Sequence, residues 1–531
     1  MSTNSSLELT NYYDAVPYDS QPFPQTAIEH LETMAFIFGL ETPAPAKARV
    51  LELGCAAGGN LIPFAARFPE ARAVGVDLSP VQIGQGLAAI DHAQLGNIDL
   101  RVHDIADIDA SFGQFDYIVC HGVYSWVPGV VQDAILRICS ENLAPNGVAY
   151  VSYNVYPGWK AREIVRDAML LRGGPRQSPE EKLSYGRGML EFLAESARPE
   201  SVLKKALDET MPIIRGGRSA YLLHEFYEPW NSPCYFKQFL ERAEVHGLAY
   251  LAESETSTMF VQNYAEKVRA PLLRECEGSQ ILMEQYTDFL VNRTFRQTLL
   301  VKQARSADIR YQLDAVRLRT LFFAGAYAPL DGSALTLDVR EQQCSAPRNL
   351  TVTLRVPVHK AVAQLLDEHY PAALTVDALV TLAAERTGEP RAAVDALTMA
   401  MLEEMLILGA VRVRRAAPNV ATVVSKLPQA LPAVRRRLAG EPDAARSMSA
   451  CTQWHEQALL TPLERSLLPL LDGAHTHEAL RAHIVSEAKL DRLRFLKDGQ
   501  PIVAAEVSPE FIGHELSLAL GGLRRKGLLV A

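Results

Sequence analysis

A glycine-rich stretch near residue 55 has the residue types of a ligand-binding turn. Apolar runs precede and follow it, so we expect a strand, a tight turn and then a buried helix. The glycines would let backbone N–H groups approach a ligand closely, and the start of the following helix would favour an anionic group. This chemistry suits a nucleotide-like ligand. The stretch reads Glu52-Leu53-Gly54-Cys55-Ala56-Ala57-Gly58-Gly59-Asn60.

Two carboxylates at the ends of later expected strands narrow the choice of ligand. Asp77 ends the next apolar strand, where it could bind two ribose hydroxyls. Asp104 ends the third strand and could meet an adenine amine. A dinucleotide fingerprint would read G-x-G-x-x-G, whereas residues 52–58 read acid-x-Gly-x-small-x-Gly. This pattern resembles the S-adenosyl-L-methionine site of class I methyltransferases.

The expected cofactor site draws on several parts of the chain. Glu52 and the turn would hold the methionine end of the cofactor. Ala56 stands where a glycine is more usual, so a methyl group must fit where backbone and ligand come close. An aromatic, proline-rich arm at residues 12–23 would form a lid, although a surface arm that merely packs is an alternative. The expected cofactor-binding residues are Tyr13, Tyr18, Glu52, Gly54, Ala56, Gly58, Asn60, Asp77, Leu78, Asp104, Ile105 and His121.

The segment after the fourth expected strand, residues 120–128, is unusually aromatic for a loop. It would close over the transferring methyl group. Tyr124 and Trp126 could wall an acceptor channel or face the sulfonium, because a cation near an aromatic face is stabilised by about 0.5–2 kcal/mol. Packing of the loop is the alternative for Trp126. His121 could take a proton from the acceptor, or serve as a structural hydrogen-bonding group.

A second segment, residues 153–159, ends the fifth expected strand on the same face. Asn154 and Tyr156 could orient an amine by accepting its hydrogen bonds. The alternative is a turn that Asn, Pro and Gly stabilise.

Composition excludes several classes of protein. The chain has 531 residues, 48% of them hydrophobic and 22% charged, which is ordinary for a globular protein of three or four domains. A net charge of −9 argues against binding nucleic acid by neutralising phosphates. The seven cysteines include no C-x-x-C pair, so we expect neither a disulfide framework nor a metal site. No signal peptide or membrane span is expected, and a cytoplasmic location fits best.

Strand and helix patterns alternate from Arg49 to Asn154, which predicts a mostly parallel, doubly wound α/β sheet. Its ligand should lie across the carboxyl ends of the strands, beside the first strand. After Trp159 the sequence is rich in helix patterns before a core helix and strand return, so we expect a helical insertion. The expected strands are Arg49–Gly54, Ala71–Asp77, Asn97–Asp104, Phe115–His121 and Gly147–Asn154, with helices at Pro80–Ala89 and Val131–Leu143.

A weak internal repeat marks the C-terminal half. Thr375 and Leu379 in one copy match Thr476 and Leu480 in the other, and each copy resembles a winged-helix unit. Packing modules are favoured over DNA recognition, because the connector between the copies holds the only conspicuous basic run of an acidic chain. The expected domains are a cofactor-binding domain at 1–260 with an insertion at about 172–222, a helical middle or regulatory domain at 261–345, a winged-helix-like module at 346–415, a connector at 416–446 and a second winged-helix-like module at 447–531.

Four segments carry a further resemblance: His121–Pro128, Tyr150–Asn154 with Pro157–Trp159, the arm from Tyr13 to Tyr18, and Asp288–Leu300. Together they resemble the bacterial methyltransferases with a methyltransferase regulatory domain, characterised in the rickettsial outer-membrane-protein lysine methyltransferases. The resemblance runs from about residue 12 to residue 300, and the C-terminal half is similar only in layout. It implies a cofactor domain with a dimerising insertion, a middle domain, and a C-terminal domain that forms an open cleft for a protein substrate.

The function that this resemblance implies is S-adenosyl-L-methionine-dependent N-methylation of lysine side chains in a protein, for instance an outer-membrane or envelope protein before export. The enzyme would be a homodimer. An apolar, aromatic cleft would lower the lysine pKa from about 10.4, so no dedicated base is required. Two alternatives stay open: a methyltransferase for a small molecule, and a non-catalytic regulatory protein that binds the cofactor. The residues expected at the reacting centre are Tyr124, Asn154 and Tyr156, with His121 as a further candidate.

Overall fold

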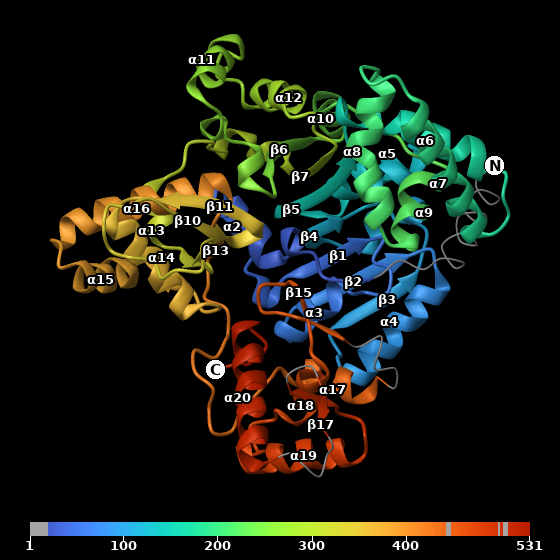
Figure 1. Cartoon of the computed structure of the whole chain (residues 1–531). Coiled ribbons are helices and arrows are strands. Elements are labelled where there is room, and N and C mark those ends of the chain that lie inside the picture. The colour runs from blue at the N-terminus through green and yellow to red at the C-terminus, as the bar shows by residue number, and fades with distance from the viewer. Residues whose placement is uncertain (1–19, 442–447, 498–499, 503–507) are drawn as a thin grey trace.

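Short apolar strands alternate with helices to build one central sheet and the layers around it (Figure 1). The computed structural model describes residues 20–441, 448–497, 500–502 and 508–531. In that part of the chain the sheet has seven strands in the order β3-β2-β1-β4-β5-β7-β6. The order reverses between β1 and β4, the place where doubly wound sheets bind ligands. The strands are β1 (Arg49–Leu53), β2 (Arg72–Asp77), β3 (Ile98–Val102), β4 (Phe115–Cys120), β5 (Leu143–Asn154), β6 (Leu248–Glu253) and β7 (Phe295–Lys302).

The five strands expected from the sequence are confirmed and pair in parallel, as the alternation of strand and helix patterns predicts. Strand β5 begins at Leu143 rather than at Gly147, because Leu143 already pairs with Phe115 before an irregularity in the ladder. Helices connect these strands or cover them. They are α2 (Ile28–Ile37), α3 (Leu61–Arg67), α4 (Pro80–Ala93), α5 (Gly129–Glu141) and α10 (Phe236–Val245).

Strand β7 lies beyond residue 260, where we expected the cofactor domain to end. It runs antiparallel to both β5 and β6 and fills the space between them. Its Arg296 is 1% exposed and forms ion pairs of 2.9 Å with Asp288, Glu284 and Glu253. The guanidinium therefore joins β7 to β6 and to the helix α12 (Gln280–Leu290) inside the protein.

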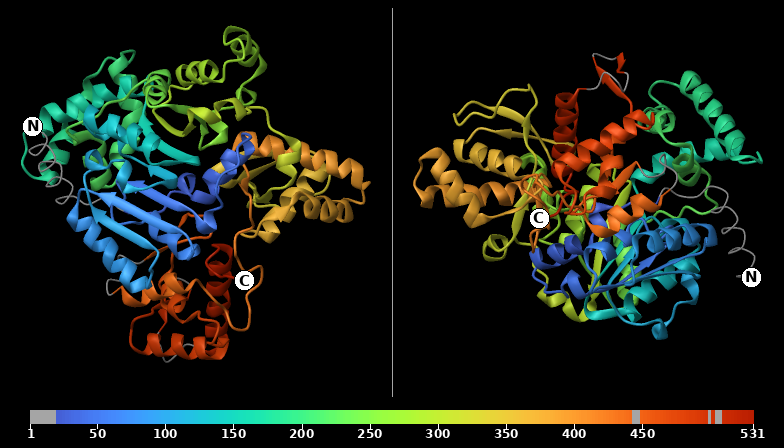
Figure 2. Two further views of the ribbon diagram at one scale, coloured as in Figure 1. Left: turned by 180° about the vertical axis from the view of Figure 1, so that it is seen from behind. Right: turned by 90° about the horizontal axis from the view of Figure 1, so that it is seen from below.

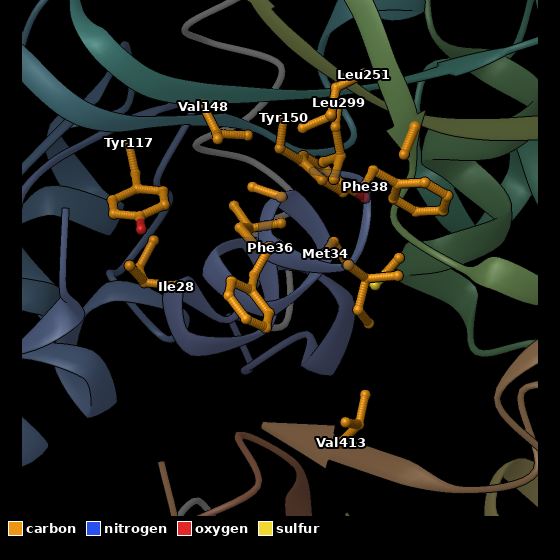
Figure 3. Packing of buried hydrophobic residues seen from close by; sticks show 14 of the residues in the cluster. Ile28, Met34, Phe36, Phe38, Tyr117, Val148, Tyr150, Leu251, Leu299 and Val413 are labelled. Carbon is orange, nitrogen blue, oxygen red and sulfur yellow. The ribbon is translucent and has the colours of Figure 1, made fainter. Parts of the chain in front are cut away.

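Helix α2 packs between the sheet and the C-terminal half of the chain (Figure 3). Its Met34 and Phe36 lie between the sheet residues Tyr150 and Leu299 and the side chain of Val413. One apolar core therefore extends from the sheet into the first C-terminal module.

The expected helical insertion is a bundle with its own apolar core. Its tight packing depends on two glycines, because a Cβ at Gly173 or Gly186 would collide with the hydroxyl of Tyr227. That hydroxyl donates to the carbonyl of Lys182 at 2.6 Å. The helices are α6 (Gly158–Gly173), α7 (Pro179–Ser196), α8 (Val202–Gly216) and α9 (Ser219–Tyr227).

The segment expected to be a helical middle domain contributes helices and also short strands. After it, two modules follow that share a helix arrangement. The middle elements are α11 (Glu266–Glu275), α12, α13 (Ala315–Arg319), β8 (Phe322–Ala324), β9 (Ala328–Pro329), β10 (Gln342–Ala346) and β11 (Leu350–Leu354). The first module contains α14 (Pro357–His369), β12 (Leu374–Thr375), α15 (Val376–Thr387), α16 (Arg391–Leu408) and β13 (Arg412–Arg414). The last part contains α17 (Pro432–Gly440), β14 (Ser449–Cys451), β15 (Gln457–Leu459), α18 (Pro462–Leu467), α19 (His477–Lys489), β16 (Phe495–Lys497), β17 (Gln500–Ile502) and α20 (Pro509–Arg525).

The internal repeat has a structural basis in the caps of two helices. Thr375 accepts a hydrogen bond from the Ala378 N–H and begins α15, and Thr476 does the same for Ala479 and α19. The leucine that follows each threonine, Leu379 or Leu480, is fully buried. The second module has an apolar core of its own.

The arginines of the connector make hydrogen bonds within this protein. Arg435, Arg436 and Arg437 on α17 donate to the carbonyls of Pro469, Ala93 and Ser449. Through Ala93 the connector contacts α4, so the C-terminal helices lie beneath the α4 end of the sheet (Figure 2). These contacts agree with the expectation that the C-terminal modules serve in packing.

Arg296→Met should destabilise the protein, because three buried carboxylates would lose their shared cation. Removing one partner of a buried ion pair costs about 3–5 kcal/mol, so the midpoint of urea unfolding should fall. Arg355→Met is the matched control: this exposed arginine pairs with Glu341 at 2.8 Å, and such surface pairs contribute about 0–1 kcal/mol. Equal midpoints for the two variants would contradict the structural role of Arg296.

Candidate active site

The glycine-rich stretch between β1 and α3 forms the tight turn that the sequence predicts. Gly54 and Gly58 have φ angles of +74° and +71°. Ala56 also lies in the left-handed region, with φ at +49°, so the residue that departs from glycine bears local strain. A Cβ on Gly54 would collide with Val123, which brings the loop after β4 directly against the turn.

Asp77 fixes the shape of this turn. One carboxylate oxygen accepts the Ala56 N–H at 2.8 Å, and the other accepts the Ser79 N–H at 2.9 Å. The carboxylate thereby joins the turn to the start of α4 at the carboxyl ends of β1 and β2. A carboxylate oxygen has two acceptor sites, so this position is compatible with the expected ribose contact.

Other predicted cofactor residues collect along the same edge of the sheet. Asp104 follows β3 and accepts the Ala106 N–H at 2.9 Å, which begins the short helix that contains Ile105. The His103 N–H donates to the Asp77 carbonyl at 2.9 Å, so the ends of β2 and β3 are joined. Leu78, half-buried, follows Asp77 directly. The structure therefore brings Asp77, Leu78, Asp104 and Ile105 together.

Glu52 lies beneath the turn and is 4% exposed. Its Oε1 accepts the side-chain N–H of Asn60 at 2.9 Å, whereas its Oε2 is buried without a hydrogen-bond partner among the described residues. Burial is the main reason why the pKa of Glu52 rises to about 8, and the charge of Asp77 acts in the same direction. A buried carboxylate oxygen without a donor fits the ammonium group of a methionine moiety, so the residues present suit the expected cofactor.

Asn60 is the centre of a buried hydrogen-bond network. While its Nδ2 donates to Glu52, its Oδ1 accepts from the Phe23 N–H at 3.1 Å and the Thr26 hydroxyl at 3.0 Å. The same oxygen lies 2.7 Å from Nε2 of His455, which belongs to the C-terminal part of the chain. Three distant segments therefore meet at one amide.

His455 is neutral in this network. Arg67 donates to its Nδ1 at 2.9 Å, so the ring proton is on Nε2 and points to Asn60. Burial is the main reason why the pKa of His455 is well below its ordinary value, and the charges of Arg67 and Arg414 act in the same direction. Sequence reasoning missed this residue, because His455 lies 395 positions from Asn60 and no local motif surrounds it.

The chain before α2 crosses the glycine-rich turn. The Gly59 N–H donates to the Ser20 hydroxyl at 2.7 Å, and a Cβ on Gly59 would collide with the Ser20 backbone. Further along, the Phe23 ring lies 4.2 Å from the His121 ring. This course agrees with the expected arm over the cofactor site. Tyr13 and Tyr18, the expected cofactor-binding residues of this arm, lie outside the described residues.

His121 has the environment of a structural histidine. Its Nδ1 lies 2.9 Å from the Tyr150 hydroxyl and 3.2 Å from the Ser152 hydroxyl. Burial lowers the pKa of His121 to about 4, so the ring is neutral near pH 7. The conjugate acid of such a base is strong, and His121 would therefore bind a proton from an ammonium group only weakly.

Tyr124 packs inside the loop where we expected it to wall a channel. It is 0% exposed and meets Tyr153 and Phe239 edge-on, with ring centroids 6.0 and 5.2 Å apart. Trp126 likewise packs edge-on against Trp159 at 5.9 Å. In this conformation both aromatic residues anchor the loop, which favours the packing alternative for Trp126.

Asn154 and Tyr156 end β5 close to the helical insertion. The Asn154 side chain donates to the Asn231 side chain at 3.0 Å and is buried. Tyr156 is half-buried, its hydroxyl donates to Glu163 at 2.7 Å, and the Lys160 ammonium lies 3.8 Å from its ring centroid. The Tyr156 ring therefore already attracts an alkylammonium group.

A strip of aromatic rings continues from Tyr156 to the protein surface. Tyr235 lies 5.4 Å from Tyr156, and Phe289 stacks on Tyr235 at 5.6 Å. Phe289 is 56% exposed. The sequence contained no signal for this strip, because its three rings come from segments that are far apart in the chain.

Comparison with known proteins agrees with this architecture. A methyltransferase domain model matches residues 50–147, a "predicted methyltransferase regulatory domain" matches residues 218–302, and a "PKMT, C-terminal winged helix domain" matches residues 427–528. The uncharacterized protein RP028 of Rickettsia prowazekii (strain Madrid E) is 39% identical over 233 residues, which cover 44% of this chain and 93% of that protein. The chain belongs to the bacterial methyltransferases that carry a methyltransferase regulatory domain.

The chain is also similar to a longer protein and to a solved structure. The uncharacterized protein RP789 of the same organism is 42% identical over 291 residues, or 55% of this chain, and the chain spans about half, 52%, of that relative. The solved structure of PKMT2 from Rickettsia typhi has a TM-score of 0.85 and 28% identity, and the match covers 97% of this chain and all of PKMT2. PKMT2 has also been solved in complex with AdoHcy, again with a TM-score of 0.85 and the same coverage, at 27% identity.

Membership of this methyltransferase family confirms the expected fold: a class I methyltransferase sheet, a regulatory domain and a C-terminal winged-helix domain. S-adenosyl-L-methionine is the cofactor of the methyltransferase domain. None of the helices in the described part of the chain combines the length and the apolar character needed to cross a bilayer.

Asp77→Ala should abolish detectable binding of S-adenosylhomocysteine by isothermal calorimetry. The substitution removes the acceptor that holds the Ala56 and Ser79 N–H groups, and also the proposed ribose contact. Asp99→Ala is the control, because Asp99 lies on the neighbouring β3, is half-exposed and pairs with the surface residue Arg101. Unchanged affinity in Asp77→Ala would refute the assigned role.

His455→Ala should weaken cofactor binding although the residue lies in the C-terminal part of the chain. Loss of a buried hydrogen bond costs about 1–3 kcal/mol, and an Asn60 side chain that keeps only Phe23 and Thr26 as donors would present its Nδ2 to Glu52 less firmly. We expect an affinity about tenfold lower by calorimetry. His477→Ala changes a partly exposed histidine of the same region that bonds the Ser425 carbonyl, and should leave the affinity unaltered. Identical affinities for the two variants would show that the C-terminal part does not support the cofactor site.

Proposed function

We propose that this protein is an S-adenosyl-L-methionine-dependent methyltransferase that N-methylates lysine side chains of a protein substrate. The proposal rests on the structural similarity to PKMT2. This similarity extends over the C-terminal modules as well as the cofactor domain. A methyltransferase for small molecules has no evident need for two additional modules. The aromatic strip from Tyr156 to Phe289 adds independent support.

The bound cofactor would supply an activated methyl group, which passes to the lone pair of the acceptor nitrogen as the carbon–sulfur bond breaks and its electron pair stays on sulfur. The protein's part is to hold the two reactants in line, which can contribute about 7–11 kcal/mol. The turn, Glu52 and Asp77 would hold the cofactor. His121, whose pKa is lowered to about 4 by burial, is too weak a base to take the proton of an ammonium group.

The acceptor lysine must be neutral before it can attack. An aromatic, apolar path desolvates an ammonium group and lowers its pKa, and the released proton can pass to water. Tyr156 would attract the lysine, as it attracts Lys160 in this structure, and Asn154 would orient the nitrogen. Tyr124 would act by holding the loop beside them.

The helical insertion supports a further proposal, that the enzyme is a homodimer. It exposes Leu171, Phe192 and Val202, which are 72%, 61% and 69% accessible in the single chain. Large apolar side chains exposed in one region often mark a protein interface.

The purified chain should transfer tritium from labelled S-adenosyl-L-methionine to proteins of a bacterial cell-envelope fraction, and acid hydrolysis should release the label as Nε-methyl-lysine. Asp77→Ala should lower the incorporation at least a hundredfold, because the cofactor no longer binds. Label found only in small molecules would support the small-molecule alternative. Cofactor binding by calorimetry without any transfer would instead favour a non-catalytic regulatory protein.

A further inference from the structure

A cavity of about 120 Å³ lies where the cofactor domain, the first module and the C-terminal part meet. Its wall includes His30 on α2, the chain after β6, the strand β13 and the segment at residues 454–456. Three arginines line it: Arg348, Arg412 and Arg414. None of these belongs to the proposed methyl-transfer site, so a role for the cavity does not rest on that function.

Arg414 carries a buried charge with which no carboxylate of the described residues forms an ion pair, although the charges of Glu29 and Glu456 act on it from farther away. It is 8% exposed, and its partners within hydrogen-bond distance are uncharged: His30 Nδ1 at 3.2 Å and the Val413 carbonyl at 3.0 Å. Among the described residues, no carboxylate lies within ion-pair distance of it. Burial lowers the pKa of Arg414 to about 10, which still leaves it charged near pH 7. The Trp454 ring lies 5.1 Å from the guanidinium and closes one side.

The other charged groups of the cavity balance one another. Arg348 lies 3.7 Å from Glu255, and Arg412 is paired with Glu456. His30 is neutral, because its Nε2–H donates to the Ser254 carbonyl at 2.7 Å and its Nδ1 accepts from Arg414. Three guanidinium groups therefore face two carboxylates, and one positive charge is left over.

Two further observations indicate a site for a ligand. The Nε of Arg412 is buried without a hydrogen-bond partner among the described residues. Arg348 and the following Asn349 both have left-handed backbones, with φ at +63° and +59°. Left-handed backbone at two consecutive residues other than glycine is rare. It occurs often at functional sites, where it orients a side chain toward a ligand. At the mouth of the cavity, the Arg348 side chain is 35% exposed.

We propose that this cavity binds a small oxyanion, phosphate or a short carboxylate, through Arg414 at its base and Arg348 and Arg412 on its sides. A planar guanidinium presents paired N–H donors that match the oxygens of either group. The volume suits a ligand of a few heavy atoms, since a cavity of about 150 Å³ holds one benzene. A nucleotide is too large.

Binding of an oxyanion in this cavity would also affect the cofactor site. Trp454 contacts Arg414 and is the immediate neighbour of His455, whose ring bonds Asn60. The oxyanion would thus hold together the three parts of the chain that meet at the cavity, and would favour the arrangement in which His455 supports the glycine-rich turn.

The test uses the full-length protein and inorganic phosphate as the first probe, with malonate as the carboxylate probe. Thermal unfolding is measured in each salt and in sodium chloride at the same ionic strength, and affinity is measured by isothermal calorimetry. We expect a higher melting temperature with at least one probe than with chloride. A response to phosphate alone, or to malonate alone, supports the site and identifies its ligand class.

Three variants decide where the anion binds. Arg414→Gln should weaken the affinity at least tenfold, and Arg348→Gln several-fold. Arg355→Gln, which changes an exposed arginine of the same part of the chain, should have no effect. If Arg414→Gln does not fold, the comparison of Arg348→Gln with this control decides the question, because Arg348 is half-exposed. The proposal is overturned if neither probe exceeds chloride, or if Arg348→Gln and the control bind the anion equally well.

Discussion

The side chain of Asn60 sets the geometry on which the rest of the active site depends. Its single amide donates to the buried Glu52 and accepts from the N-terminal segment and from His455. Most of these groups are buried, where an unpaired polar atom is costly, so the hydrogen bonds of the network support one another. The turn, the arm above it and the C-terminal part consequently have one mutually consistent arrangement. The cofactor site is built by the complete chain, although its motif lies within nine residues.

Local patterns in the sequence predicted the centre of the sheet well. The first five strands are apolar runs between turns, and Gly54, Gly58 and Asp77 occupy the positions that their types require. Strand β7 could not be located in this way, because its place is decided by antiparallel pairing with β6 and with β5, which precedes it by more than a hundred residues. Its Arg296 is charged and yet fully buried, and only the carboxylates that fold around it make that possible.

For the candidate residues of methyl transfer, too, the sequence alone does not reveal contacts between distant segments. An aromatic loop can line a ligand path or anchor itself, and the sequence alone does not distinguish the two. Tyr124 and Trp126 are anchors in this structure, because Phe239 and Trp159 come from other segments to meet them. The aromatic strip that reaches the surface consists instead of Tyr156, Tyr235 and Phe289. His455 belongs to no motif, and its role depends wholly on a contact between distant parts of the chain.

The two copies of the C-terminal repeat differ in how they are attached. The apolar core of the first copy is continuous with that of the sheet, whereas the second copy encloses a separate core. Cooperative units of folding follow such boundaries. The second copy can therefore melt as a unit of its own while the sheet remains folded, and the first consequence would be the departure of His455 from Asn60. In this architecture, unfolding of a peripheral module would remove a hydrogen bond that supports the cofactor site, while the sheet itself stays unchanged.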